Sequence, residues 1–336
     1  MKMILFDYRD SEKEFFKKNE FPDIDIIFKE CPLNETTFLT EEEMNDTDVI
    51  SVFINSNLSE DVLKKFKNLR VVTTRSTGYN HIDIKHCSQN NIAVFNVEKY
   101  GQSAVAQYTI TLILALIRNL LPAYLGLQKL LVDHSLYEGH NLETMTLGII
   151  GGGSIGSSVA KYAHSLGMNV KVCSLEKDTE LLKFVEYVDF EDLLATSDVI
   201  SLHIPYTSEN YHLLSDKEFE LMKKDVYIVN TARGELIDDV VLYENLLSGK
   251  VRAAALDVLE CEFLSLSNDE TVDINSVNSK CVKSALIARK LLAMENVIIT
   301  PHIAYNTVES IEHLLTSTFN SIRDHAKGMH TNQIRL

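Results

Sequence analysis

Three charged side chains follow apolar, strand-like runs in the second half of this 336-residue chain: Arg233 in VNTARGEL, Glu262 in ALDVLECEF and His302 in VIITPHIAYNT. A guanidinium binds a carboxylate through two parallel hydrogen bonds, and an imidazole exchanges a proton near neutral pH. A carboxylate beside the imidazole favours its protonated form. These residue types predict a site that binds a carboxylate and exchanges a proton. A single histidine more often packs than catalyses, so the rest of the sequence must support this assignment.

A glycine-rich turn in TLGIIGGGSIGSSVA (146–160) has the spacing GxGxxG. It follows an apolar run, opens a helix with one apolar face, and is followed by a second strand-like run, NVKVC (169–173). This context predicts a βαβ unit that holds the pyrophosphate of a dinucleotide at a helix N-terminus. The predicted cofactor contacts are Gly151, Gly153, Ser154, Ile155 and Gly156.

Ser174 ends that second strand, where such units usually carry an acid that binds the ribose. A serine can bond a ribose hydroxyl but neither repels nor neutralises a 2′-phosphate. The nearby Glu176 would disfavour a 2′-phosphate, whereas Lys177 would favour one. NADP therefore stays open as an alternative, and NAD is preferred because no arginine lies near in the sequence.

The elements that would position these residues form two series. Apolar runs at 2–8, 23–28, 48–54, 69–75 and 91–97 are continuous rather than alternating, as in parallel strands covered on both faces. A helix over about 103–120, ended by Pro122, precedes a second series at 146–150, 169–173, 198–204, 226–232, 253–259 and 297–302. A last helix follows Asn306 and Glu309, which resemble a capping box, and the polar segment 263–282 reads as a surface excursion. The pattern predicts an α/β fold with two doubly wound parallel sheets.

Composition excludes several classes of function. The formal net charge of −16 repels nucleic acid and anionic membranes, and no basic patch is visible. The five cysteines have no CxxC spacing, so neither a disulfide framework nor a metal site is predicted, and Cys261 is expected to be an ordinary, partly buried thiol. The first residues lack a signal-peptide pattern and the longest apolar run (110–117) is too short for a membrane span, so a cytoplasmic location is expected.

Seven motifs along nearly the whole chain resemble those of the D-isomer-specific 2-hydroxyacid dehydrogenases. They are RSTGYNHIDI (75–84), NVEKYGQSAVA (96–106), GIIGGGSIG (148–156), DVISLHIP (198–205), VNTARGELID (229–238), ALDVLECE (255–262) and TPHIAYNT (300–307). The D-lactate dehydrogenase branch is most similar, because Phe263 replaces a common proline and PHIAYNT replaces a glycine-rich stretch. The resemblance implies a flavodoxin-like split substrate domain, 1–100 plus 300–336, around an inserted Rossmann NAD-binding domain, 101–299.

The same resemblance assigns roles to individual residues. Arg233, Glu262 and His302 match the family's catalytic arginine, glutamate and histidine. The residues that match its substrate-binding positions are Ser76, Thr77, Gly78 and Tyr100, and further cofactor contacts are implied at Val105, Ser174, His203, Thr231, Ala232 and Asp257. A homodimer formed through helices in 101–125 is also implied.

The function expected is NAD-dependent reduction of pyruvate, or a near 2-keto acid, to the D-2-hydroxy acid, with His302 as general acid and base. One alternative keeps this chemistry with a larger branched 2-keto acid or hydroxypyruvate as substrate. Another, of a different class, is a dinucleotide-sensing regulator without turnover, which would need only the glycine turn. The expected partners are a small-molecule 2-keto or 2-hydroxy acid and a second copy of the chain, with no nucleic acid and no membrane.

Overall fold

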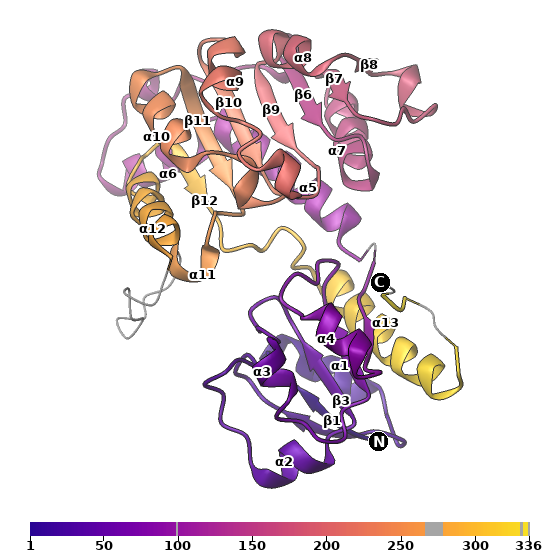
Figure 1. The fold of residues 1–336 in the computed structure, drawn as a ribbon. Coiled ribbons are helices and arrows are strands. Elements are labelled where there is room, and N and C mark those ends of the chain that lie inside the picture. The colour runs from indigo at the N-terminus through magenta and orange to yellow at the C-terminus, as the bar shows by residue number, and fades with distance from the viewer. Residues whose placement is uncertain (99, 266–277, 330–331, 335–336) are drawn as a thin grey trace. The chain divides into compact units, whose positions relative to one another are not determined.

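The chain divides into two compact units, Met1–Tyr100 with Asn306–Leu336 and Gly101–Tyr305 (Figure 1). The structure is a computed structural model that describes residues 1–98, 100–265, 278–329 and 332–334. Each unit is built on its own parallel sheet, so the predicted fold class is confirmed.

The smaller unit has a five-stranded sheet in the order β2-β1-β3-β4-β5, the flavodoxin-like order. Its elements are β1 (Lys2–Leu5), α1 (Lys13–Lys18), β2 (Asp25–Phe28), α2 (Glu41–Asp46), β3 (Val49–Val52), α3 (Glu60–Leu63), β4 (Val71–Thr74), α4 (Ile84–Gln89), β5 (Ala93–Phe95) and α13 (Val308–Ala326). The last helix returns to this unit and packs on β4. Its Phe319 also stacks on Phe21, which precedes β2, with ring centroids 3.9 Å apart. The central strands are buried along their whole length, as continuous apolar runs in a covered parallel sheet require.

The larger unit has a seven-stranded parallel sheet in the order β12-β11-β10-β9-β6-β7-β8. Its strands are β6 (Thr146–Ile150), β7 (Asn169–Cys173), β8 (Glu186–Tyr187), β9 (Val199–Leu202), β10 (Val226–Asn230), β11 (Val251–Leu256) and β12 (Val297–Ile299). Its helices are α5 (Gln102–Ile117), α6 (Leu120–Gln128), α7 (Ser154–Ser165), α8 (Phe190–Thr196), α9 (Asp216–Leu221), α10 (Asp239–Ser248), α11 (Glu262–Ser265) and α12 (Ser279–Leu292). The strand order reverses at β6, which pairs with β7 on one side and β9 on the other. Ligands of doubly wound sheets bind beyond the carboxyl ends of the strands at such a reversal.

Two apolar clusters cover the two faces of this sheet. Side chains of α5 and α7, such as Ile113 and Val159, pack on one face. Side chains of α8, α9, α10 and α12, such as Phe219 and Leu291, pack on the other. Burying one aliphatic side chain of this size contributes about 1.5–3 kcal/mol, so both layers hold the strand ends rigidly.

The helix expected over 103–120 is two helices. α5 ends at Ile117, Asn119 takes a left-handed conformation (φ 48°), and α6 begins at Leu120. Pro122 therefore lies in the first turn of α6, where its missing N–H costs nothing because the first amides of a helix have no intrahelical partner. Among the described residues no single helix is long and apolar enough to cross a membrane, although α5 and α6 together, bent by 59°, pass that test by length and composition.

Further differences from the sequence expectations concern loops. The last helix is capped by Thr307, whose side chain accepts from the Ser310 amide, rather than by a box of Asn306 and Glu309. Residues 266–277 of the expected excursion lie outside the described residues, while its two ends are helical, in α11 and the start of α12. Residues 300–305, expected with the substrate domain, belong to the larger unit, because Thr300 and His302 donate backbone hydrogen bonds to β11 and the residue after it.

The expectation of no disulfide is wrong. Cys261 and Cys281 are bonded, with Cα atoms 5.5 Å apart, because α12 folds back beside the turn that precedes α11. Cys31, Cys87 and Cys173 are unpaired among the described cysteines.

Candidate active site

The side chains of Glu262 and His302 lie within ion-pair distance of each other at the carboxyl edge of the larger sheet. Nδ1 of His302 lies 2.9 Å from Oε2 of Glu262, and the side chains are 27% and 29% exposed. The other Glu262 oxygen accepts from the Leu259 amide at 3.2 Å. Since an ionised carboxylate can only accept, Nδ1 of His302 carries a proton in this arrangement. Nε2 is then the imidazole atom left to exchange a proton with a bound molecule.

Asp257 holds the loop that carries His302. Its buried carboxylate accepts from Thr300 Oγ1 at 2.6 Å, from the Ile303 amide at 2.9 Å and from the Ala304 amide at 2.8 Å. Its carbonyl accepts from the His302 amide at 2.9 Å. Burial raises the pKa of Asp257, against the hydrogen bonds that favour its charged form. His302 itself is left-handed, with φ 52°, a conformation that non-glycine residues adopt only when their surroundings impose it.

Arg233 lies on a neighbouring turn, after β10. Asn230 braces this turn, since its side chain donates to the Arg233 carbonyl at 2.8 Å and accepts from the Ala232 amide at 3.0 Å. A Cβ atom on Gly234 would overlap the backbone of Leu259 and Glu260. The Arg233 turn therefore packs directly on the turn that leads to Glu262. The guanidinium is exposed, and its Nη1 donates to the Ala232 carbonyl.

The glycine turn between β6 and α7 fits a pyrophosphate. Gly151 has φ +103°, and a Cβ there would lie 2.5 Å from the His203 carbonyl oxygen. A Cβ on Gly156 would overlap the Gly151 carbonyl, so this glycine lets the helix approach the strand. At Gly153 an added Cβ would meet nothing within 4 Å in the described residues, which leaves open space before the first amides of α7. These features match the cradle that a dinucleotide requires.

The remaining predicted cofactor residues surround this turn or lie on adjacent strands. Ser174 follows β7 and lies against Gly152, where a Cβ would be 3.1 Å from the serine oxygen. Thr231, buried beside Ala232, shares a 2.9 Å hydrogen bond with Thr109 of α5, the helix that also carries Val105. His203 follows β9 and bonds Ser201 Oγ at 2.8 Å through Nε2. Burial lowers the pKa of His203 to about 3, so its ring is neutral.

The predicted substrate loop belongs to the smaller unit, after β4. Its carbonyls are engaged, because the Val97 amide donates to Ser76 and the Asn96 side chain donates to Thr77. The Ser76 hydroxyl donates to the Gly78 carbonyl at 2.6 Å. Within the described residues, the amides of Thr77 and Gly78 donate to no protein acceptor. Two backbone amides are thus left for an anion. Tyr100 lies at the end of this part of the unit, and its carbonyl accepts from Ser310 Oγ.

Arg75, at the start of this loop, anchors it to the residues that follow β1. It is only 2% exposed, donates to the carbonyls of Phe6 and Asp7, and lies 3.6 Å from Glu12. Sequence reasoning missed Arg75, Asn230 and the loop-bracing contacts of Asp257. The signal was present for Asn230 alone, because an asparagine before a turn often bonds the backbone two residues on. Among the described residues no group of three or more His, Cys, Asp or Glu side chains could hold a metal ion.

The fold and the glycine turn define a class of protein: a doubly wound sheet with a dinucleotide-binding βαβ unit, in one chain with a flavodoxin-like sheet. Residues 110–304 match the family described as D-isomer specific 2-hydroxyacid dehydrogenase, NAD binding domain. The chain therefore belongs to the NAD-dependent D-isomer-specific 2-hydroxyacid dehydrogenase family.

Relatives across the chain agree with this family. The hydroxypyruvate reductase of Thermotoga maritima is 36% identical over 266 residues, 79% of this chain and 80% of the relative. The D-lactate dehydrogenase of Escherichia coli is 30% identical over 332 residues, 98% of each chain. The crystal structure of the Aquifex aeolicus D-lactate dehydrogenase complexed with NAD and lactic acid superposes with a TM-score of 0.84 at 32% identity, over 97% of this chain and 96% of that one.

Proposed function

We propose that this protein reduces pyruvate, or a 2-keto acid of similar size, to the D-2-hydroxy acid with NADH. The observation that carries the proposal is the Glu262–His302 pair at 2.9 Å, on a loop braced by Asp257 and beside the turn that carries Arg233. A protein that only sensed a dinucleotide would need the glycine turn but not this pair. The D-lactate dehydrogenases among the relatives support pyruvate as the substrate.

Each side chain has a defined task in this proposal. Arg233 binds the substrate carboxylate and polarises the keto oxygen. A reduced dinucleotide held at the glycine turn of Gly151, Gly153 and Gly156 would supply the hydride. Nε2 of His302 gives its proton to the carbonyl oxygen as the alcohol forms, and Glu262 stabilises the imidazolium before transfer. In the oxidative direction Nε2 of His302 accepts the hydroxyl proton.

NAD is the proposed cofactor rather than NADP. Ser174 stands where the ribose hydroxyls are expected, and no arginine that could bind a 2′-phosphate lies near it in the sequence. Dissociation constants for NADH and NADPH, measured by cofactor fluorescence, test this preference directly. We expect NADH to bind at least tenfold more tightly.

The test of the reaction is a substrate panel with the purified full-length chain. NADH oxidation is followed with pyruvate, hydroxypyruvate and a branched acid such as 2-ketoisocaproate, and the product is resolved by chiral chromatography. We expect the highest kcat/KM with pyruvate and a D-configured product. A highest kcat/KM with hydroxypyruvate, the alternative favoured by the Thermotoga maritima relative, would replace the substrate and keep the mechanism. Binding of NADH without turnover of any keto acid would contradict the enzyme assignment.

A further inference from the structure

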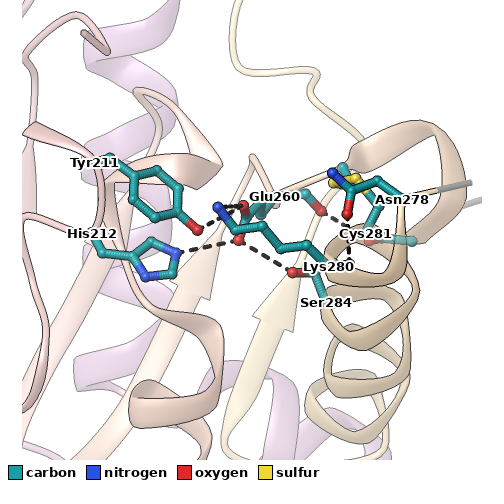
Figure 2. The surroundings of a disulfide bond; sticks show 9 residues. Tyr211, His212, Glu260, Asn278, Lys280, Cys281 and Ser284 are labelled. Atoms are coloured by element: carbon teal, nitrogen blue, oxygen red, sulfur yellow. Dashed lines mark hydrogen bonds and ion pairs between the residues drawn. A yellow bond between two sulfur atoms is a disulfide. The ribbon is translucent and has the colours of Figure 1, made fainter. Parts of the chain in front are cut away.

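The disulfide between Cys261 and Cys281 joins the proposed catalytic turn to helix α12. Cys261 lies between Glu260 and Glu262, and Cys281 lies in the first turn of α12 (Figure 2). Both cysteines are partly exposed. A small oxidant or reductant can therefore reach them, unlike the fully buried thiol of Cys87.

Glu260, on one side of Cys261, anchors the turn to its surroundings. Its buried carboxylate accepts from Tyr211 Oη at 3.0 Å and Ser284 Oγ at 3.1 Å, and lies 3.3 Å from His212 Nε2 (Figure 2). Lys280, next to Cys281, lies over the Tyr211 ring and 3.7 Å from Glu260. The disulfide and these contacts of Glu260 and Lys280 together hold the start of α12 against the turn that contains Cys261.

Glu262, on the other side of Cys261, is the partner of His302. Its placement depends on the backbone of Cys261, which is left-handed with φ 51°. A non-glycine residue leaves this region readily when its surroundings no longer impose it. The Cys261 carbonyl accepts from the Leu264 and Ser265 amides, and the disulfide is the one covalent constraint on the Cys261 side chain. Opening the disulfide therefore loosens the backbone that aims Glu262 at His302.

We propose that Cys261–Cys281 is a thiol–disulfide modification site whose redox state sets how firmly Glu262 is held against His302. A thiolate of a dithiol carrier attacks one sulfur, the Cys261–Cys281 bond breaks, and a mixed disulfide forms. The carrier's second thiol then displaces the protein sulfur. Two electrons and two protons pass to the cysteines, and the carrier leaves as its own disulfide. An oxidised carrier reverses the reaction.

The inference rests on the proposed function, since Glu262 and His302 must be the reacting pair for the switch to change turnover. Cys261 and Cys281 are positioning residues that act through Glu262. The bonded state is the more active one.

The test compares the full-length enzyme after treatment with dithiothreitol, a dithiol, and after reoxidation with diamide. Peptide mass mapping after alkylation should show Cys261 and Cys281 bonded before reduction and both alkylated after it. We expect reduction to lower kcat about 3–10-fold with little change in the KM for NADH, and reoxidation to restore it. The variants C261S and C281S should be locked at the lower kcat and insensitive to dithiothreitol.

Two controls separate this role from a structural one. C31S removes an exposed, unpaired thiol and should keep the full redox response. In an E262Q background, C281S should cause no further loss, because the two changes act through one contact. The inference is overturned if Cys261 and Cys281 are alkylated without reductant, or if kcat is unchanged or higher after reduction. Absence of turnover in both redox states would instead contradict the proposed function, while the mass mapping would still decide whether the bond exists.

Discussion

At the scale of single residues, His302 combines a partly exposed imidazole with a left-handed backbone that its neighbours hold in place. Replacing it by glutamine keeps a polar side chain of similar reach but removes the proton that Nε2 exchanges. We predict that H302Q lowers kcat about 10²–10⁴-fold, the usual contribution of a general acid, and leaves NADH affinity unchanged. Steady-state kinetics and cofactor fluorescence measure the two effects.

The matched control for H302Q is H134Q, which makes the same exchange at an exposed histidine in the 3-10 helix His134–Tyr137. It should retain wild-type kcat. A kcat for H302Q within a few-fold of wild type would remove His302 from the mechanism.

Substitution of Asp257 tests whether the loop that carries His302 must be held by these hydrogen bonds. An asparagine there keeps the shape but turns one acceptor atom into a donor that faces a donor, so at least one buried group loses its partner. We predict that D257N loses about 1–3 kcal/mol of unfolding free energy in urea titrations and about tenfold in kcat. T300V removes only one of the hydrogen bonds to Asp257 and should have a smaller effect on both. Equal losses in the two variants would contradict the bracing role.

The proposed catalytic residues could be predicted from the sequence, whereas the contacts that brace them could not. Arg233, Glu262 and His302 stand out because a charged side chain directly after an apolar run is unusual. Asp257 follows an apolar run too, but its bracing contacts depend on where residues 300–304 fold back, and local pattern does not contain that information. The Cys261–Cys281 bond could not be predicted for the same reason. It depends on where α12 lies, and the first residues of that helix resemble a polar loop in the sequence.

At the scale of elements, the turn between β6 and α7 separates the steric role of its glycines from their binding role. Gly156 cannot accept a Cβ without moving the Gly151 carbonyl, whereas Gly153 has open space and an extended backbone with φ −66°. We predict that G156A lowers unfolding free energy by about 1–3 kcal/mol, as overpacking does. G153A should keep its stability and weaken NADH binding at least tenfold, because its methyl group occupies the space for the pyrophosphate. Normal NADH affinity in G153A would place the cofactor elsewhere.

Helix α10 begins with a buried acid whose titration should be measurable. Burial, reinforced by the nearby Glu260, Asp238 and Glu235, raises the pKa of Asp239 to about 8, and one of its oxygens has no partner among the described residues. The unfolded-state pKa is about 3.9, so the folded state binds this proton more tightly. The contribution of Asp239 to stability is therefore full below about pH 4 and is lost as the pH rises towards about 8.

The predicted consequence is that wild type loses roughly 2–5 kcal/mol of unfolding free energy relative to D239N between about pH 4 and pH 8. Urea titrations at several pH values measure the difference. D216N changes the first residue of α9, an exposed acid in the same helical position, and should show no such pH dependence relative to wild type. Parallel curves for D239N and wild type would mean that the pKa of Asp239 is the same in the folded and the unfolded protein.

At the scale of the whole molecule, both parallel sheets were predictable, because long apolar runs separated by helical patterns leave few alternatives. The break between α5 and α6 was not, since proline is tolerated in a first helical turn as well as after a last one. That break has a consequence for assembly. It leaves α6 and the following residues with a series of exposed apolar side chains: Leu120, Leu121, Tyr124, Leu125, Leu127, Leu130, Leu131, Val132 and Leu136.

We predict that this apolar surface is the contact between two copies of the chain. Leu127 and Leu130 are 60% and 83% exposed, and α6 contacts the 3-10 helix that carries Leu136, so the surface is continuous rather than scattered. Apolar patches of this kind usually mark an interface, and a two-fold axis would bury the same patch on both copies.

Light scattering after gel filtration should give twice the 38.0 kDa chain mass. The double variant L127D/L130D should elute as a monomer with an unchanged circular dichroism spectrum, because each copy would place two charges in the buried contact. L175D introduces a charge at a fully exposed leucine outside this surface and should leave the dimer intact. A monomeric wild type, or a double variant that remains a dimer, would show that another partner or another face covers these residues.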